Sequence, residues 1–377
     1  MTLPLPCPEL FSLESGVVYM DNASISPIPI AVELAAKQAV SSKARPWRRD
    51  RLRAQALVSE LRERAAALVQ ARPQDIAVTC AASYGLAVAR ANLPVSPGER
   101  ILVLEGDHTS QMLTWQAHAQ ACGAVVDQVA RPRDGDWTRA ITDHLANDDK
   151  RRIALASLCA TFWIDGSRID LPTVCPILKA RGAHLVLDLT QSVGVLDADL
   201  PTLQADFAVF PMYKWLLGPY SVAFLYVGPQ WQGGEPLEQN SFNRAVDGGY
   251  AEGAARFDMG ERDTFVGLPT ALSALELGAQ WSRDAVRTHL SGLTGQIAAQ
   301  LAAEGLDCVP ASNRSVHILG VGGLPDGVAA RCREQGVTFT QRHGSVRISP
   351  HVFNTRADAD RCAQALLSAV RHIRCHS

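Results

Sequence analysis

The sequence predicts an α/β protein with a mostly parallel central sheet, helices on both faces and a smaller α+β region toward the C-terminal end. Three observations predict it. Apolar runs of strand length alternate with helical segments between residues 76 and 227, which is the pattern of a doubly wound sheet. The chain has 377 residues, more than a single hydrophobic core usually serves. Beyond Val227 a Gly-rich polar segment, a helical stretch and two late strands replace the alternation.

We therefore expect a large domain over residues 15–262 and a small domain over residues 263–377, with residues 1–14 packing against the small one. Hydrophobic residues make up 47% of the chain and charged residues 20%, with a net charge of -2. This balance is that of a globular protein without a nucleic-acid or membrane partner. Residues 1–14 have no basic start and no long apolar run, so we expect a cytoplasmic enzyme. Nine scattered cysteines without a CxxC pair favour neither a disulfide framework nor a metal site.

The first elements in chain order are a strand before Asn22, a Pro-rich turn and a helix, followed by a strand, a small-residue turn and a helix over residues 76–93. Asn22 taken alone is a turn residue, because asparagine tolerates turn geometry. Ala82 and Ser83 let the backbone approach a ligand closely, and amides at a helix N-terminus suit a phosphate. A plain N-cap is the alternative for Ser83.

Polar residues then follow several predicted strands. Residues 101–106 form a strand that leads to Asp107 and His108, although a lone histidine at a strand end is often structural. The strand at residues 153–159 leads to Trp163. The strand at residues 184–188 ends in Asp188, the strand at 206–210 delivers Lys214, and a third apolar run spans residues 221–227.

Asp188 and Lys214 are expected to face one crevice, because ligands in open α/β sheets bind outside the carboxyl ends of the strands. Burying an unpaired ion is costly, so each charge needs a partner. A cofactor with a basic ring nitrogen and an aldehyde would supply both partners. Pyridoxal 5′-phosphate is such a cofactor: an aspartate keeps its pyridinium protonated and a lysine forms a Schiff base with it. An ordinary strand-end salt bridge is the alternative that the pair alone leaves open.

With these motifs in order, the chain resembles the aminotransferase class V family of fold-type I pyridoxal-phosphate enzymes, which includes cysteine desulfurases, kynureninases and isopenicillin N epimerases. The resemblance runs from MDNASISP at residues 20–27 to VRISPHVFNT at residues 346–355. Its most specific part is DLTQSVG, followed by MYKWLLGPYSVAFLYV with Lys214 26 residues after Asp188. The compact link into VRISPHVFNT favours the epimerase-like branch. The resemblance also implies a homodimer with shared active sites.

Position by position, the resemblance implies roles around the cofactor. Lys214 would form the internal Schiff base and Asp188 would pair with the pyridine nitrogen. Gln191 would bind the phenolic oxygen of the ring, and His108 would stack on the ring. The phosphate would be bound by the turn at Ala82 and Ser83.

Other positions bear on the substrate and the second subunit. Arg347 matches the arginine that grips a substrate carboxylate by a bidentate fork, and Asn22 would lie beside that carboxylate. Thr264 is a candidate phosphate ligand from the partner subunit, although Gly260 and Glu261 stand where the family has a Gly-Thr pair.

Three positions depart from the common family pattern. Tyr213 precedes the lysine where most members have histidine, as in kynureninases, and its hydroxyl would serve the phosphate. Pro211 replaces a hydroxyl residue and removes one phosphate donor. Trp163 stands where desulfurases have asparagine, which suggests an aromatic wall against the substrate side chain.

The resemblance implies an enzyme that acts on an α-amino acid. The substrate amine would displace Lys214 to form an external aldimine, and the lysine would then take the α-proton and leave a Cα carbanion. Lyase, aminotransferase and epimerase outcomes all remain open. A desulfurase needs a loop cysteine that residues 336–346 lack, and Cys332 lies in the preceding helical run. The resemblance to kynureninases rests mainly on Tyr213.

Two functions from other classes have weaker support in the sequence. A nicotinamide dehydrogenase is suggested only by VHILGVGGLPDG at residues 316–327, which lacks the full GxGxxG spacing. A catalytically silent binding protein is the other, and the intact set of Asp188, Gln191 and Lys214 argues against it.

Overall fold

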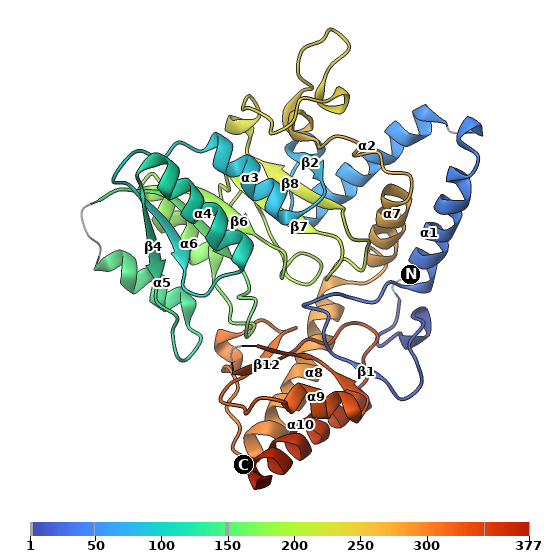
Figure 1. The fold of residues 1–377 in the computed structure, drawn as a ribbon, viewed down its shortest axis with the longest axis vertical. Helices are drawn as coiled ribbons and strands as arrows, with labels where there is room; N and C mark the ends of the chain where they lie inside the picture. The colour runs from blue at the N-terminus through green and yellow to red at the C-terminus, as the bar shows by residue number, and fades with distance from the viewer. Residues whose placement is uncertain (1–2, 49, 148–150, 343, 377) are drawn as a thin grey trace.

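The computed structural model describes residues 3–48, 50–147, 151–342 and 344–376. A large α/β part carries the central sheet, and a smaller part holds the C-terminal strands and helices together with the strand nearest the N-terminus (Figure 1). None of the helices in these ranges is long and apolar enough to cross a bilayer.

The central sheet has seven strands in the order β2-β8-β7-β6-β5-β3-β4. All neighbours are parallel except that β8 runs antiparallel to both β2 and β7, which confirms the mostly parallel sheet. The strand bounds are β2 Ile76–Thr79, β3 Arg100–Leu104, β4 Val125–Val129, β5 Ile153–Cys159, β6 His184–Asp188, β7 Phe207–Pro211 and β8 Ala223–Val227.

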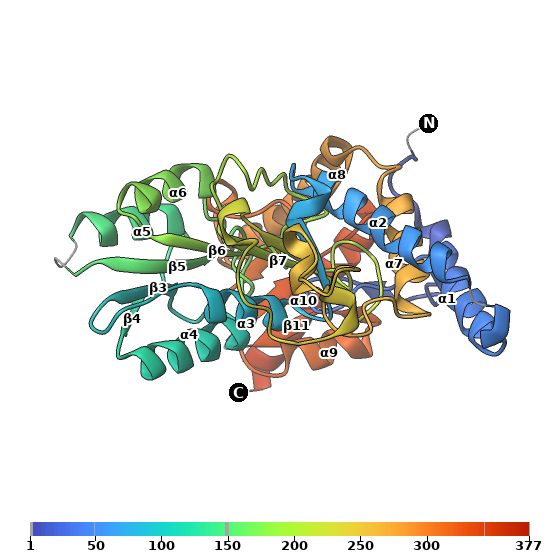
Figure 2. The same cartoon turned by 90° about the horizontal axis from the view of Figure 1, so that it is seen from above.

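Helices cover both faces of this sheet. Figure 2 shows α5 and α6 on one face and α3 and α4 on the other. Side chains of β3 divide accordingly, since Leu102 and Leu104 belong to one buried cluster and Ile101 and Val103 to another, as alternation along a strand requires. The helix bounds in this part are α1 Ile30–Lys43, α2 Arg51–Leu68, α3 Ala82–Asn92, α4 Thr109–Cys122, α5 Trp137–Ala146, α6 Leu171–Ala180 and α7 Gly267–Gly278.

Helix α3 lies especially close to the sheet. A Cβ atom on Gly85 would stand 2.4 Å from Cγ1 of Val209 on β7, a distance that no side chain tolerates. A glycine at this position therefore lets α3 approach the strand that leads to Lys214.

The smaller part has a three-stranded antiparallel sheet in the order β11-β12-β9, and β1 pairs parallel with β10. Its elements are β1 Val18–Tyr19, α8 Arg283–Ala303, β9 Leu319–Val321, α9 Val328–Glu334, β10 Val337–Thr338, β11 Thr340–Arg342, β12 Ser345–Ile348 and α10 Arg356–His376. Cys7, Phe11 and Met20 share its core with α8 and α10. Helix α7 instead packs on α1 and α2. The boundary between residues 262 and 263 stays a prediction.

The Gly-rich segment at residues 228–263 contains turns and three short 3-10 helices. It is anchored by Asp258, which is buried, accepts a hydrogen bond of 2.9 Å from the Val78 amide and pairs with Arg62 and Arg262. The 3-10 helices of the chain are Pro8–Leu10, Pro46–Arg48, Pro73–Asp75, Pro229–Trp231, Ser241–Asn243, Gly253–Phe257 and Ala311–Asn313.

Candidate active site

A cavity of about 250 Å³ lies at the carboxyl ends of the parallel strands, where the sequence predicts a ligand. Its walls include eight of the eleven candidate site residues: Ala82, Ser83, His108, Trp163, Asp188, Gln191, Tyr213 and Lys214. Asn22, Arg347 and Thr264 are outside this lining set. The remaining wall residues are Cys80, Ala81, Asp107, Ser110, Cys159, Thr161, Thr190, Pro211, Tyr220 and Ser221.

Lys214 follows β7 and is 8% exposed. The pKa of its amine is lowered from 10.5 to about 8, mainly by burial and also by the positive charge of Arg347, while the Asp188 carboxylate partly opposes both effects. The loop that carries Lys214 packs closely against Gly194, because a Cβ atom on Gly194 would lie 2.5 Å from the carbonyl oxygen of Trp215. The neutral amine is the form that attacks an aldehyde, and a lowered pKa increases the neutral fraction.

Asp188 and Gln191 lie on the neighbouring strand end and its loop. Oδ1 of Asp188 accepts a hydrogen bond of 2.9 Å from the Thr190 amide. The Gln191 side chain is held at both ends, since Nε2 donates to the Ala23 carbonyl at 2.9 Å and Oε1 accepts from Trp215 Nε1 at 2.8 Å. One Nε2 hydrogen remains for a ligand, because a primary amide has two.

His108 is the N-cap of α4, and its Nδ1 accepts a hydrogen bond of 3.3 Å from the Ser110 amide. Its ring meets the Trp163 ring edge-on, with the centroids 5.4 Å apart. Burial lowers the pKa of His108, so the ring is neutral at neutral pH. A neutral imidazole can cover the face of a flat heteroaromatic ligand without adding charge.

Asp107 is a wall residue whose role the sequence did not reveal. It is 8% exposed, and its Oδ1 accepts a hydrogen bond of 2.7 Å from the His108 amide. Its Oδ2 is buried without a hydrogen-bond partner among the described residues. Burial raises the pKa of Asp107 to about 7. No local sequence signal marks it, because an aspartate before a helix is usually an ordinary cap.

One wall of the cavity has the features of an anion cradle. Helix α3 begins at Ala82, and its N-cap Ala81 makes no side-chain capping bond, so its first amides are available. Ser83 is the second residue of the helix, which rules out the alternative of a plain N-cap. The rings of Tyr213 and Tyr220, which also line the cavity, stack with their centroids 4.2 Å apart.

Arg347 lies on β12 and is 4% exposed. Its Nη1 donates to the Trp163 carbonyl at 2.6 Å, and its Nη2 donates to Ser24 Oγ at 2.6 Å and lies 3.6 Å from Asp21 Oδ1. Its Nε has no partner in the described part of the chain. The Trp163 carbonyl therefore links Arg347 to the wall of the cavity.

Asn22 and Thr264 have different surroundings. Asn22 is fully buried and donates through Nδ2 to the Ser349 carbonyl at 2.8 Å, while its Oδ1 lacks a partner in the described ranges. Thr264 lines a separate hollow together with Arg45 and Arg53. Its predicted contact with a phosphate in a partner subunit stays a prediction.

These features fit pyridoxal phosphate. The cavity offers an amine of lowered pKa, a carboxylate for a ring nitrogen, a neutral imidazole and an uncapped helix N-terminus. Two of its wall residues, Asp107 and Thr190, also hold buried oxygens with no partner in the part of the chain that is described. Such orphaned atoms in a native protein usually await a ligand or water.

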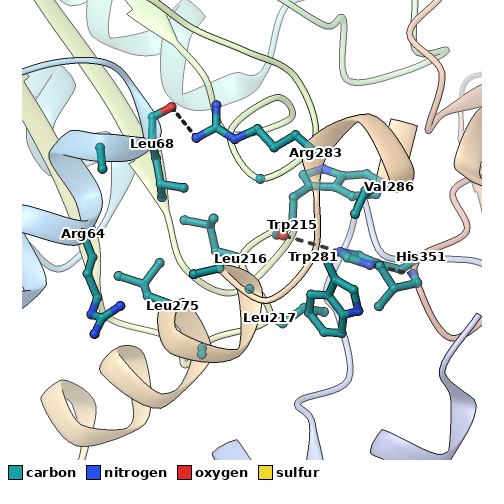
Figure 3. Close-up of a pocket in the computed structure, with 16 residues that line it drawn as sticks. Arg64, Leu68, Trp215, Leu216, Leu217, Leu275, Trp281, Arg283, Val286 and His351 are labelled. Carbon is teal, nitrogen blue, oxygen red and sulfur yellow. Dashed lines mark hydrogen bonds between the residues drawn. The ribbon is translucent and has the colours of Figure 1, made fainter. Parts of the chain in front are cut away.

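A second cavity, of about 330 Å³, lies behind the lysine loop (Figure 3). Leu68, Leu216, Leu217 and Leu275 give it an apolar lining, and Arg64 and Arg283 also border it. It lacks Lys214 and Asp188, so it is not the catalytic cavity. Trp215 belongs to its wall and donates a hydrogen bond to Gln191. Gln191 lines the catalytic cavity, so this hydrogen bond joins the walls of the two cavities.

Comparison with known proteins identifies the family. The model of the family "Aminotransferase class-V" matches residues 18–322. A probable cysteine desulfurase of Methanothermobacter thermautotrophicus is 24% identical over 93% of this chain and 94% of its own. A kynureninase of Burkholderia mallei is 27% identical over 77% of this chain and 71% of its own.

The fold agrees with these relatives. The crystal structure of the cysteine desulfurase CsdA from Escherichia coli superposes with a TM-score of 0.85, at 21% identity, over 97% of this chain and 98% of that chain. The comparisons bear on the family as a whole, and the epimerase-like branch stays a prediction. The chain belongs to the aminotransferase class-V family and is a pyridoxal-phosphate enzyme of fold type I.

Proposed function

We propose that the protein acts on an α-amino acid and that Lys214 both holds the cofactor and takes the α-proton of the substrate. One observation carries the proposal: a buried lysine with its pKa lowered to about 8 shares a cavity with Asp188 and lies within the electrostatic influence of Arg347. A base works best when its pKa is near the operating pH. The amine of Lys214 therefore has the basicity that α-proton removal requires.

Bound pyridoxal phosphate supplies an electron sink for negative charge that develops at Cα. Asp188 would keep the ring nitrogen protonated, and Gln191 would donate to the phenolic oxygen with its remaining amide hydrogen. His108 would cover the ring. Ser83 and the first amides of α3 would hold the phosphate.

Arg347 would bind the substrate α-carboxylate. Its Nε–H is buried without a partner in the described residues, so a donor is ready for an anion. The hydrogen bond from Nη1 to the Trp163 carbonyl fixes the plane of the guanidinium. Asp21, 3.6 Å away, balances the charge when no substrate is bound. Such a pre-oriented fork favours bidentate binding of a carboxylate.

A desulfurase reaction of the kind that the relatives' names suggest needs a thiolate near the substrate. Cys80 and Cys159 line the cavity, and burial raises the pKa of both thiols. Cys332 is fully buried, and its pKa is raised to about 12. A reactive cysteine requires a lowered pKa. We therefore favour outcomes that need no protein thiol: transamination, epimerisation or loss of a β-substituent.

A kynureninase-type reaction is the second candidate, because Tyr213 precedes the lysine and stacks on Tyr220 beside the cofactor site. Kynurenine turnover that is lost in Tyr213→Phe would support it. No turnover of kynurenine by the holoenzyme would exclude it.

We also propose a homodimer in which Thr264 of one subunit contacts the phosphate bound by the other. Pro211 lines the cavity and cannot donate a hydrogen bond, so a donor from elsewhere would complete the phosphate site. Sedimentation of the holoenzyme tests the dimer, and an active monodisperse monomer would contradict it.

The experiment for the main proposal follows the bound cofactor and the substrate together. The twenty common amino acids are added to the holoenzyme, and absorbance changes are recorded along with α-proton exchange in D2O by NMR. We expect at least one amino acid both to change the cofactor absorbance and to exchange its α-proton. The exchange should vanish in Lys214→Ala. Exchange that persists in Lys214→Ala would refute the role of the lysine.

A further inference from the structure

A second arginine, Arg342, lies beside the wall residue Trp163, although it is outside the set of residues that line the cavity. Strands β11 and β12 are antiparallel, with Thr340 opposite Arg347 and Arg342 opposite Ser345. Side chains opposite one another share a face of the hairpin, and so do residues two apart on one strand. Arg342 and Arg347 therefore project from the same face as diagonal neighbours.

That face is turned toward the catalytic cavity. The guanidinium of Arg342 lies over the Trp163 ring, 5.7 Å from its centroid. Trp163 is itself a wall of the cavity, and its indole Nε1 donates to the Gly106 carbonyl at 3.0 Å. Its carbonyl accepts from Arg347 at 2.6 Å. Trp163 thus stands between the two arginines and is held in place from both its side chain and its backbone.

The two arginines differ in their charge balance. Arg347 has Asp21 at 3.6 Å, and Asp21 is also bound by Ser24 and Thr340. Arg342 is exposed and forms no ion pair with an acidic side chain within the described ranges. Its positive charge lowers the pKa of Lys214, His108 and Arg347. A positive charge that the described residues leave without a counter-ion therefore lies beside Trp163, a wall residue of the cavity.

We propose that Arg342 and Trp163 form a second anion subsite, which selects amino acids whose side chain ends in an acid group. The inference rests on the proposed function, in which Arg347 takes the α-carboxylate and the side chain extends along Trp163. The indole packs against the methylene groups of the side chain, and Arg342 pairs with the terminal carboxylate. Preferred substrates are then dianionic amino acids of the aspartate or glutamate type.

Matched acid and amide pairs test the subsite. The holoenzyme is titrated with L-aspartate and L-asparagine, and with L-glutamate and L-glutamine, while the cofactor absorbance is followed. We expect the acid of at least one pair to bind roughly 10-fold to 100-fold more tightly than its amide, as hydrogen bonds to charged groups usually contribute. Arg342→Gln should reduce this ratio to within about 3-fold. Arg342→Lys should keep part of it, because a lysine retains the charge without the fork.

Two further readouts separate the subsite from general effects. Arg333→Gln, an exposed arginine on α9, should leave the acid-to-amide ratio unchanged. Raising ionic strength should lower the ratio in the wild type and leave it flat in Arg342→Gln. The cofactor spectrum of each variant without substrate reports whether the site is intact.

The outcomes distinguish the two claims. Equal binding of acid and amide in both pairs, or a preference for the acid that survives in Arg342→Gln, overturns the subsite and leaves the proposed function standing. If no amino acid perturbs the cofactor spectrum or exchanges its α-proton, the proposed function itself fails. An acid preference that Arg342→Gln abolishes and Arg333→Gln retains supports the subsite.

Discussion

The lowered pKa of Lys214 can be tested through the rate at which the apoenzyme captures its cofactor. Only the neutral amine attacks the aldehyde, and the pKa falls from 10.5 to about 8. At pH 7 this raises the neutral fraction roughly 300-fold, since each pKa unit is a factor of ten. The rate of capture should therefore rise with pH up to about 8 and level off above it.

The assay is stopped-flow absorbance after mixing apoenzyme with pyridoxal phosphate from pH 6 to pH 10.5. Nα-acetyllysine, measured over the same range, corrects for ionisation of the cofactor itself. Two variants should move the midpoint in opposite directions. Arg347→Gln removes a charge that lowers the pKa, so the midpoint rises, whereas Asp188→Asn removes a charge that raises it, so the midpoint falls. A corrected rate that keeps rising through pH 10 would refute the assignment.

Three other predictions concern stability. Burial raises the pKa of Asp107 from 3.8 to about 7, so the native apoenzyme holds this proton more tightly than the unfolded chain does. The free energy of unfolding should therefore fall as pH rises from about 4 to about 7. Asp107→Asn should remove this loss, up to about 4 kcal/mol, in urea titrations. Trp215→Phe deletes the hydrogen bond to Gln191 and should cost about 1 kcal/mol in the same titrations, and an unchanged midpoint would contradict it. Asp258→Ala leaves Arg62 and Arg262 without their shared buried carboxylate and should cost about 3–5 kcal/mol, measurable as a lower Tm.

The sequence predicts the central sheet well because its inner strands are built on apolar runs, whereas the edge strand β4 (VVDQV) is partly exposed. The strands that end at Asp188 and lead to Lys214 come within a residue of their observed bounds. The direction of β8 was not predicted, because an apolar run buried on both faces looks the same in either orientation. The irregular connection at residues 212–222 contains no helix and is shorter than the crossover that a parallel neighbour needs, which fits the antiparallel placement of β8.

Sequence reasoning identified His108 and Trp163 because each comes shortly after a predicted strand. It also placed Asp107 after a strand, but an aspartate that precedes a helix looks like an ordinary cap. The burial of Asp107 in the cavity lining, near Asp188, depends on tertiary contacts and could not be predicted. Arg342 reaches Trp163 across the junction of the two parts of the molecule. The link from Arg347 to Asp21 likewise depends on the bridge between Asp21 and Ser349.

The most direct test of the account is to locate the cofactor on the chain. Borohydride reduction of the holoenzyme fixes the cofactor on its lysine, and peptide mass spectrometry then identifies the residue. We predict the pyridoxyl group on Lys214 alone. A pyridoxyl group on Lys37, Lys43, Lys150 or Lys179, or a reduced holoenzyme with no modified lysine, would contradict the account.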